Sequence, residues 1–525
     1  MTELPTIGEA LHAAARAHPT RRGWACSGEE ITFAEMHERT RRLAAGLLSL
    51  GIGRGDRIAL NAPNVTAWVE VYLAAASIGA VVVGLNVRYR SSELAHILEQ
   101  SGASAVVTVP ELGDTDYVKL IGGLAVESLR HVVTIGAGGD LTLDELRAHE
   151  PDEGRFAAAA EAVSPDDPVM IIYTSGTTGQ PKGATLTHRS QLAAARAQVE
   201  HCRMDADDVL PVALPLNHVG GMTCGVMTCL LARACCVLIP AFGKAAIHDA
   251  FERFRPTIWM GVPTMHTVLL GGAQFSNLDT ATVRLVISGG ANADPALLER
   301  LQSGFPNATV MNLYGASETS GATVMSPWDS DFDSTVRSVG RAIGDARIKI
   351  VDGRGAPLPA GESGEVCIAA ASLARGYYEM PEATATAFRD GWFHTSDLGS
   401  LDDRGYLTLR GRTKELFIQG GFNVYPVEVE NVLLAHPAVE SCAGIGVPDA
   451  VLGEIGRYYV VAAAESPPTA DELIEHCRRQ LADYKVPREI VFRTQLPLTP
   501  TGKVRKAVLM EEARADPAAG VGGRR

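Results

Sequence analysis

The sequence predicts an α/β protein with a large N-terminal domain of α/β sheets, a small β-barrel-like part and a small α+β C-terminal domain. Short apolar runs alternate with helical patterns over residues 7 to about 315, as in proteins built around a largely parallel sheet. Over residues 338–410 the pattern changes to short β segments separated by turns, which predicts the barrel-like part. After Lys414, strand and helix patterns mix in a compact stretch.

A length of 525 residues exceeds one ordinary domain. We therefore expect a large N-terminal domain over residues 1–411, with the barrel-like part at about 338–410. A small mobile domain is expected over residues 412–510. The tail at 511–525 is rich in Gly and Ala and is expected to be disordered.

Composition excludes several classes of protein. The formal charge of −14 argues against general nucleic-acid binding. The 9 cysteines are scattered without a CxxC pair, so we expect small buried residues, not a disulfide framework or a zinc site. The first eleven residues lack the features of a signal peptide. The longest apolar stretch, residues 219–239, contains Arg233 and predicts a buried helix followed by a strand. We expect a cytoplasmic protein without a membrane span.

The elements of the first third follow in order. The glycine-rich turn at residues 51–55 follows a helical pattern and precedes a strand, the reverse of a dinucleotide-binding fingerprint, so it predicts a helix end and a turn. Residues 136–164 are expected to form a surface connection. The predicted helices are 7–17, 34–50 and 68–79, and the predicted strands are 31–33, 57–60, 80–85, 105–109 and 131–135.

Three strands of the next region end at glycine, namely those that end at Gly261, Gly289 and Gly315. Because ligands of open α/β sheets gather at the carboxyl ends of strands, we expect one shared crevice there. Helices are expected at 426–434 and 470–481. The further predicted strands of the N-terminal part are 169–173, 184–187, 208–214, 235–239, 258–263, 283–290 and 310–315.

A loop rich in Gly, Ser and Thr lies between the strands 169–173 and 184–187. Its glycines, hydroxyl groups and Lys182 suit a polyphosphate, because clustered N–H groups, hydroxyls and a lysine bind phosphate oxygens. The P-loop pattern does not fit, since Gln180 and Pro181 separate Gly179 from the lysine. The loop is therefore expected to be a hairpin tip over phosphates, with a mobile surface loop as the alternative.

The string from Tyr173 to Ala184 resembles the phosphate-binding signature of the adenylate-forming superfamily, in its acyl-CoA synthetase branch. Five further motifs stand in family order, and the resemblance covers about residues 7–506. It implies an AMP-forming acid–thiol ligase that uses ATP, Mg²⁺ and coenzyme A. It also implies that the loop and Lys182 hold the β- and γ-phosphates. The loop residues concerned are Thr174, Ser175, Gly176, Thr177, Thr178 and Gly179.

The motif at residues 312–319 supplies the nucleotide site in this resemblance. Tyr314 would lie against adenine, Ser317 would reach the α-phosphate, and Glu318 would bind Mg²⁺ together with Thr174. Most relatives have Thr at the position of Ser317, and the change keeps the hydroxyl group. One carboxylate suffices because Mg²⁺ takes most of its oxygens from phosphate and water. Gly290, Asn312 and Gly315 are expected to line the same nucleotide site.

The motifs at residues 391–399 and 410–423 resemble the ribose site and the interdomain hinge. Asp397 would accept hydrogen bonds from the ribose hydroxyls, as an ionised carboxylate can. Arg412 would contact ribose or phosphates, and Lys414 would be the pivot. Gly420, Gly421 and Asn423 would border the pantetheine tunnel. Ile418 and Asn423 differ from the Lys and Gln of plant phenylpropanoid ligases.

The C-terminal motif at residues 496–506 contains two lysines, and only Lys503 fits the family spacing. It would bridge the carboxylate and the α-phosphate, and acylation of its amine would remove that charge. The resemblance implies two half-reactions: formation of an acyl-adenylate and pyrophosphate, then attack by the coenzyme A thiol. Between them the small domain would turn about Lys414.

The resemblance implies a small-molecule carboxylic acid as the substrate, and the sequence leaves its identity open. The remaining motif of the resemblance is at residues 214–218, and it implies that His218 lies between the acyl pocket and the thiol tunnel. No aspartate stands near Val219 to hold an α-amine, which argues against an α-amino acid, and a fatty or other apolar acid, possibly aromatic, is favoured. The alternatives are a carrier protein or an amine as acceptor, an unusual acid, and a non-catalytic relative. The oligomeric state is open. The expected pocket residues are His218, Val219, Gly221, Trp259, Gly261, Gly289 and Gly315.

Overall fold

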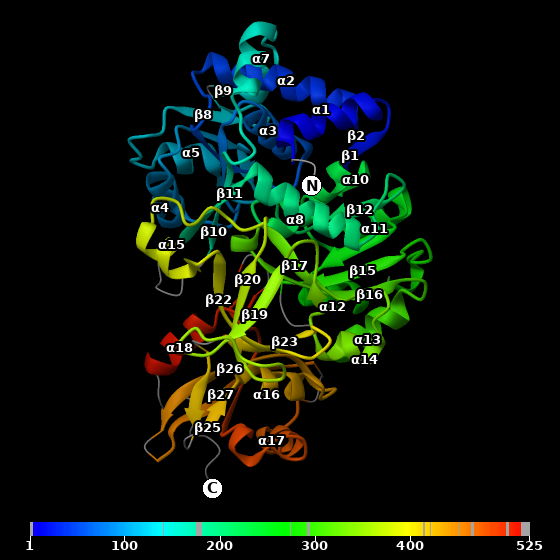
Figure 1. Cartoon of the computed structure of the whole chain (residues 1–525), viewed down its shortest axis with the longest axis vertical. Coiled ribbons are helices and arrows are strands. Elements are labelled where there is room, and N and C mark those ends of the chain that lie inside the picture. Colours follow the sequence, from blue (N-terminus) through cyan, green and yellow to red (C-terminus); the bar gives the residue numbers. More distant parts are fainter. Residues whose placement is uncertain are drawn as a thin grey trace.

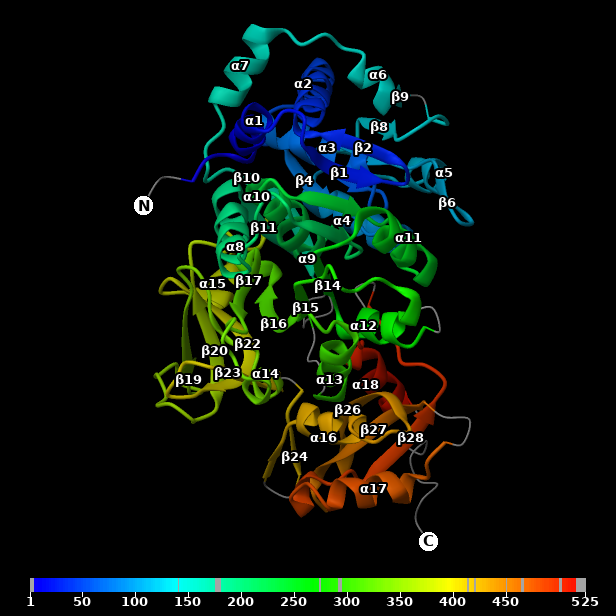
Figure 2. The ribbon, with the colours of Figure 1, turned by 90° about the vertical axis from the view of Figure 1, so that its right-hand side faces the viewer.

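The structure is a computed structural model that places two unequal bodies next to each other (Figures 1 and 2). Residues up to Arg412 form the larger body, and the orange-to-red C-terminal residues form the module below it. The predicted α/β class, with a larger N-terminal and a smaller C-terminal part, is confirmed. The structure describes residues 4–139, 141–174, 181–272, 275–290, 295–412, 415–419, 422–449, 451–463, 467–499 and 503–515.

The first sheet has seven strands, in the order β11-β10-β4-β3-β5-β8-β9. All neighbouring pairs are parallel except β10 and β11, which form an antiparallel hairpin. The loop rich in Gly, Ser and Thr therefore connects two strands, as predicted. The strands are β3 (Arg57–Asn61), β4 (Val81–Gly84), β5 (Ala105–Thr108), β8 (His131–Thr134), β9 (Leu141–Thr142), β10 (Pro168–Thr174) and β11 (Lys182–Thr187).

The second sheet has the order β14-β15-β16-β17-β18, and its first three strands are parallel. The predicted strands that end at glycine are thus neighbours, with their carboxyl ends at one edge. A third sheet has the order β12-β13-β1-β2. The strands of both sheets are β1 (Arg22–Cys26), β2 (Glu29–Thr32), β12 (Val209–Val212), β13 (Cys235–Leu238), β14 (Ile258–Gly261), β15 (Leu285–Gly289), β16 (Thr309–Ala316), β17 (Gly321–Met325) and β18 (Arg341–Ala342).

Helices cover these sheets, and helix α3 is buried on every side, as an all-round apolar sequence requires. Several helices begin with a capping box, in which Thr6 or Thr32 exchanges hydrogen bonds with the glutamate three residues later. The helices of this part are α1 (Ile7–Ala17), α2 (Phe33–Ser49), α3 (Thr66–Ser77), α4 (Ser91–Ser101), α5 (Tyr117–Gly122), α8 (His188–His201), α11 (Lys244–Phe254), α12 (Pro263–Leu270), α13 (Pro295–Gly304) and α14 (Phe332–Arg337), with a 3-10 turn η2 (Phe275–Asn277) and a small hairpin of β6 (Glu111–Leu112) and β7 (Thr115–Asp116).

The apolar stretch at residues 219–239 is a buried helix followed by strand β13, as predicted. The helix is not regular, because a π-helical segment η1 (Met222–Met227) interrupts it between α9 (Val219–Gly221) and α10 (Thr228–Ala232). Such π segments are rare and often lie at functional sites. No helix among the described residues is both long and apolar enough to cross a membrane.

The expected surface connection at residues 136–164 is exposed or half-buried over most of its length, and it also contains elements that the sequence did not predict. Strand β9 and the helices α6 (Leu143–Arg147) and α7 (Glu153–Glu161) form there. A buried ion pair fixes α6, since Arg147 donates to both carboxylate oxygens of the fully buried Glu70 at 2.8 and 2.6 Å. An unpaired charge at that position would be costly, so the pair holds α6 against α3.

The barrel-like part consists of antiparallel strands in the order β19-β20-β22-β21, with β23 on β22. The elements are β19 (Arg347–Val351), β20 (Gly364–Ala369), α15 (Pro381–Ala387), β21 (Phe388–Arg389), β22 (Trp392–Leu401) and β23 (Leu407–Arg412).

The C-terminal module contains a sheet in the order β25-β24-β27-β26, with β28 on β27, and has cores of its own. Both helices predicted there are present. The predicted tail lies mostly outside the described residues, and α18 ends at Ala515. The elements are β24 (Phe417–Gln419), β25 (Phe422–Val424), α16 (Pro426–Leu434), β26 (Val439–Asp449), β27 (Gly453–Ala462), α17 (Ala470–Arg478), η4 (Asp483–Lys485), β28 (Glu489–Arg493) and α18 (Lys506–Ala515).

Candidate active site

The hairpin of β10 and β11 places Thr174 opposite Lys182 at its end. The Thr174 hydroxyl donates to the carbonyl oxygen of Lys182 at 3.4 Å. Strand β11 also packs against the 3-10 turn η3 (Ser317–Thr319) that follows β16. The hairpin end and Glu318 are therefore brought to the same region. The predicted phosphate contacts Ser175, Gly176, Thr177, Thr178 and Gly179 lie outside the described residues.

Asp397 on β22 is held by two side chains from other strands. The Tyr314 hydroxyl on β16 donates to Asp397 Oδ2 at 2.6 Å, and Arg412 Nε on β23 donates to Oδ1 at 3.0 Å. Asp397 raises the pKa of Arg412, while burial and then Asp397 raise the pKa of Tyr314 well above its ordinary value. The tyrosine is thus a stable donor, and the carboxylate has a fixed orientation.

Lys503 comes from the C-terminal module and reaches the edge of the second sheet. A Cβ at Gly290, which has a φ of +79°, would lie 4.0 Å from Lys503 Cε. Burial and, to a smaller extent, Arg412 lower the pKa of Lys503, while Asp397 and Glu318 act to raise it. One ammonium group therefore feels the charges of three residues from β22, β23 and η3.

His218 lies close enough to Lys503 to feel its charge. Burial, and then Lys503, lower the pKa of His218 to about 4, so its ring is neutral at pH 7. Its Nδ1 accepts a hydrogen bond from the amide of Gly220 at 3.1 Å, which leaves the proton on Nε2. This ring stands at the start of the helix that contains the π segment.

Two of the glycines among the expected pocket residues are needed for close packing of the main chain. A Cβ at Gly221 would lie 2.4 Å from the carbonyl oxygen of Leu214, and one at Gly315 would lie 2.0 Å from that of Gly321. Trp259 is fully buried, donates from Nε1 to His266 Nδ1 at 3.1 Å and packs against Phe251. Close contact of main chains, and not pocket volume, thus explains these two glycines.

The remaining predicted site residues are placed as follows. Ser317 is buried in η3 beside Glu318, and the Asn312 side chain donates to the carbonyl oxygens of Thr335 and Ser338 at 2.7 and 3.1 Å. Its amide nitrogen is therefore committed to the protein. Buried Val219 follows His218, while Gly261 and Gly289 end the neighbouring strands β14 and β15. Lys414, Gly420, Gly421 and the side chain of Asn423 lie outside the described residues.

Tyr377 is a residue that the sequence reasoning missed. Its hydroxyl donates to Glu318 Oε1 at 2.8 Å, and Lys182 Nζ lies 5.1 Å from the centre of its ring. Burial and then Glu318 raise its pKa, which keeps the phenol protonated. No spacing signal marks this tyrosine, since its partners stand far away in the sequence.

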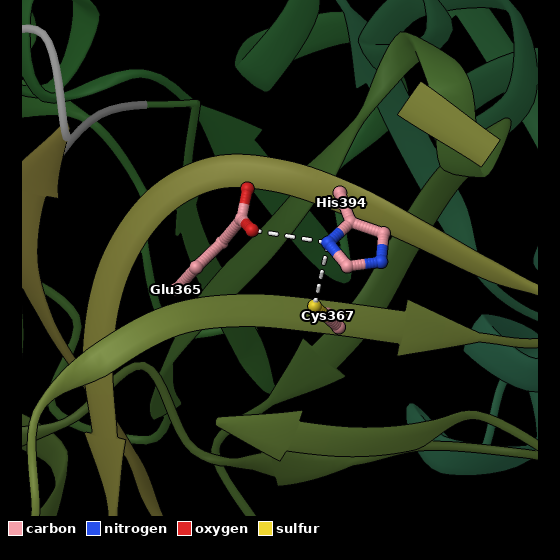
Figure 3. Close-up of side chains that lie close together, drawn as sticks. All are labelled: Glu365, Cys367 and His394. Atoms are coloured by element: carbon pink, nitrogen blue, oxygen red, sulfur yellow. Dashed lines mark hydrogen bonds and ion pairs between the residues drawn. The ribbon is translucent and has the colours of Figure 1, made fainter. Parts of the chain in front are cut away.

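Glu365, Cys367 and His394 form a cluster of potential metal ligands on β20 and β22 (Figure 3). His394 Nδ1 lies 3.0 Å from Glu365 Oε2 and 3.3 Å from Cys367 Sγ. Arg389 also lies 2.9 Å from this nitrogen, and its positive charge opposes a cation there. The other oxygen of Glu365 accepts a hydrogen bond from the amide of Ser396 at 3.0 Å. Ser396 has a φ of +60°. The cluster therefore supports the turn that precedes Asp397.

The described donors fit a nucleotide with Mg²⁺. The carboxylate of Glu318 and the hydroxyl of Thr174 offer oxygen, which Mg²⁺ prefers. Lys182 and Lys503 offer positive charge for phosphates, and Asp397 offers acceptors for hydroxyl groups.

Every cysteine is buried, as predicted.

Comparison with known proteins identifies the family. The family model described as AMP-binding enzyme matches residues 11–378, and that of the AMP-binding enzyme C-terminal domain matches residues 428–503. The chain therefore belongs to this family of adenylate-forming enzymes, as the sequence motifs predict.

Its relatives include named CoA ligases. It is 36% identical to a methyl-dioxo-octahydro-indenyl-propanoyl:CoA ligase of Rhodococcus jostii over 98% of this chain and 100% of the relative. It is 35% identical to a feruloyl-CoA synthase of an Amycolatopsis species over 91% of this chain and 93% of the relative. The crystal structure of the anthranilate CoA ligase AuaEII in complex with anthranoyl-AMP superposes with a TM-score of 0.91, at 25% identity and 99% coverage of both chains.

Proposed function

We propose that this chain activates a carboxylic acid with an apolar fatty or aromatic body and passes it to coenzyme A. By family the chain is an AMP-forming acid–CoA ligase, and ATP, Mg²⁺ and coenzyme A are the cofactors of this class. The nature of the acid and the roles of the individual residues are the parts that need a test.

The observation that carries the proposal is the convergence of five charged side chains from separate elements. Lys182 begins β11, Glu318 lies in η3, Asp397 and Arg412 pair across β22 and β23, and Lys503 arrives from the C-terminal module. Three positive groups and one carboxylate near a ribose acceptor suit an adenylating site, because charge develops on the phosphates.

In the first half-reaction an oxygen of the acid attacks the α-phosphorus of ATP. The new bond forms as the bond to the pyrophosphate breaks, which gives acyl-adenylate and pyrophosphate. Lys503 neutralises the negative charge between the carboxylate and the α-phosphate, and Lys182 binds the departing phosphates. Asp397 binds ribose, and Glu318 would hold Mg²⁺, which adds positive charge to the phosphates.

In the second half-reaction the coenzyme A thiol attacks the acyl carbon, AMP leaves, and the thiol proton passes to solvent or a base. Because Lys503 occupies the site of the first reaction, the C-terminal module must move before the thiol enters. His218 remains neutral at the boundary between acyl group and thiol, where an uncharged ring does not repel an apolar acid.

The apolar residues of the helix that follows His218 support an acid with an apolar body. Val219 and Met222 are buried next to His218, and no acidic residue stands at positions 219–227 to hold an amine. The named relatives act on cyclic or aromatic acids, which adds support for a ring-containing substrate.

The test is pyrophosphate release with a panel of medium-chain, long-chain, phenylpropenoic and cycloalkyl-propanoic acids, each with and without coenzyme A. We expect acid-dependent release with one class and a CoA thioester only when coenzyme A is present. Pyrophosphate release without any thioester would contradict coenzyme A as the acceptor. The variant Asp397→Asn is the control, and it should weaken ATP use with every acid of the panel.

A further inference from the structure

Residues 374–378, here called the β11 strap, tie the barrel-like part to the phosphate hairpin. Their main chain adds to the edge of β11: Arg375 N donates to Thr185 O at 2.9 Å, Thr185 N to Gly376 O at 2.9 Å, and Tyr378 N to Gly183 O at 2.8 Å. Tyr377 faces Ala184 in an antiparallel bridge. The strap therefore has a fixed register on the strand that begins with Lys182.

The same strap is bound to the backbone of Glu318, since the amide of Ala374 donates to its carbonyl oxygen at 2.8 Å. Both the hairpin and the turn η3 are thus fixed to one short segment. Tyr377 is the residue of the strap whose side chain also reaches both, through its hydroxyl to Glu318 Oε1 at 2.8 Å and its ring face to Lys182 Nζ at 5.1 Å.

The Tyr377 ring itself has little freedom. Phe388 packs against it with the ring centres 5.9 Å apart and a near-perpendicular orientation, and the amide of Tyr377 donates to Thr384 Oγ1 at 2.9 Å. A ring held in this way can set the position of the groups that it contacts.

We propose that Tyr377 is a positioning residue that orients Glu318 for Mg²⁺ with its hydroxyl group and Lys182 for phosphates with its ring. This inference rests on the proposed function. The phenol takes Oε1 of the carboxylate, so that Oε2 faces a defined direction for the metal ion. Hydrogen-bonding partners of metal ligands fix ligand orientation, and their loss commonly weakens metal binding by about 10-fold to 100-fold.

The ring acts on the second residue by a different interaction. An ammonium group over an aromatic face is attracted by the ring quadrupole, which keeps the flexible lysine side chain on one side of the hairpin. The two interactions of Tyr377 can be separated, because phenylalanine keeps the face and loses only the hydroxyl group.

The experiment is calorimetric titration of the full-length protein with ATP in the absence of acid, once with saturating Mg²⁺ and once with EDTA. For Tyr377→Phe we expect the gain in ATP affinity on adding Mg²⁺ to shrink by about 10-fold, with the affinity in EDTA unchanged. For Tyr377→Leu we expect the same loss and, in EDTA, ATP binding weaker by roughly threefold to tenfold.

Tyr406 supplies matched controls. Its hydroxyl is 2.9 Å from Ser330 Oγ, and Arg404 and Arg341 lie over its ring at 4.8 and 5.2 Å, in the turn between β22 and β23. Tyr406→Phe and Tyr406→Leu should leave both ATP affinities as in the unchanged protein. Thermal unfolding of all four variants identifies any that lose the fold.

A Tyr377→Phe variant that is folded and keeps the full effect of Mg²⁺ would overturn the role of the hydroxyl group. Equal ATP affinities of the Phe and Leu variants in EDTA would overturn the role of the ring. Failure of the proposed function looks different, because the unchanged protein would then show no acid-dependent pyrophosphate release even though it binds ATP with Mg²⁺.

Discussion

Lys503 and Lys506 stand three residues apart, yet their surroundings are opposite. Lys506 forms ion pairs with Glu415 and Glu430, each at 2.8 Å. Burial alone would lower its pKa, but Glu430 and Glu415 together raise it. Lys503 has a lowered pKa, and no carboxylate of the described residues lies within ion-pair distance of its ammonium group.

The comparison indicates which lysine is available for chemistry. The two carboxylates that pair with Lys506 neutralise its charge, so none is left for a ligand. Lys503 feels the positive charge of Arg412 instead, so its surroundings favour an incoming anion. The family spacing predicts Lys503 as the reacting lysine, and its surroundings support the same assignment.

The largest effect is expected from removing the buried charge of Lys506. Lys506→Met leaves Glu415 and Glu430 as neighbouring, partly buried carboxylates without their cation, so the free energy of unfolding should fall by about 3 kcal/mol, the low end for a broken buried pair. Denaturant unfolding measures this. Lys503→Met is the matched control, and this variant should be almost as stable as the unchanged protein. Equal losses of stability in the two variants would contradict the different surroundings proposed for the two lysines.

The same pair of variants should differ in the opposite sense in catalysis. Lys503→Met should slow acyl-adenylate formation by about 10²-fold to 10³-fold, the scale of losing one preorganised charge contact. Thioester formation from supplied acyl-adenylate should change much less. Single-turnover measurements of both half-reactions test this, and an equal fall in both would contradict the role given to Lys503.

The opposite pKa shifts predict that the two lysines lose their contributions at different pH values, although both losses occur as pH rises. Lys503 acts as a cation, so adenylation should be lost as pH rises through its lowered pKa, below the ordinary value of 10.5. Lys506 has a raised pKa, so its contribution to stability persists up to that ordinary value and is lost only above it. Lys503→Arg should abolish the alkaline fall in adenylation rate, and a fall that persists in this variant would assign it to another group.

The smallest effect concerns the placement of Asp397, the residue of β22 whose charge acts on Lys503. Glu365→Gln weakens the hold on the Ser396 amide and His394, so Asp397 should be less well placed and AMP should bind about twofold to tenfold more weakly. Calorimetry with AMP measures the change. Glu362→Gln, at an exposed position just before β20, is the control. Unchanged AMP binding in Glu365→Gln would leave this glutamate a purely structural role.

The fold could be predicted where local patterns decide it. Apolar runs predicted β3, β4, β5, β8 and the strands from β10 to β16, and glycine ends predicted the shared edge at Gly261 and Gly289. They did not predict the short strands β6, β7 and β9. The position of helix α6 could not be predicted in this way, because it depends on the distant pair of Arg147 with Glu70.

The site could be predicted where one motif contains the functional residue, as for Lys182, Glu318, Asp397 and Lys503. The structure brings these side chains to one region, while their roles stay predictions. Tyr377 could not be found, since its two partners lie on β11 and in η3 and meet it only after the strap adds to the sheet. Glu365 was missed for the same reason, because it acts through the backbone of Ser396.

Lys503 is held by residues close to it in the chain: Thr499 N donates to Lys503 O at 2.6 Å, Lys503 N donates to Thr499 Oγ1 at 3.0 Å, and Leu498 pairs with Val504. Lys506, three residues further on, forms ion pairs with Glu415 and Glu430. These contacts join Lys503 to the rest of the C-terminal module on both sides of its position. We therefore expect Lys503 to leave the nucleotide together with the module, so that a single turn of the module would both end the first reaction and open the way for the second.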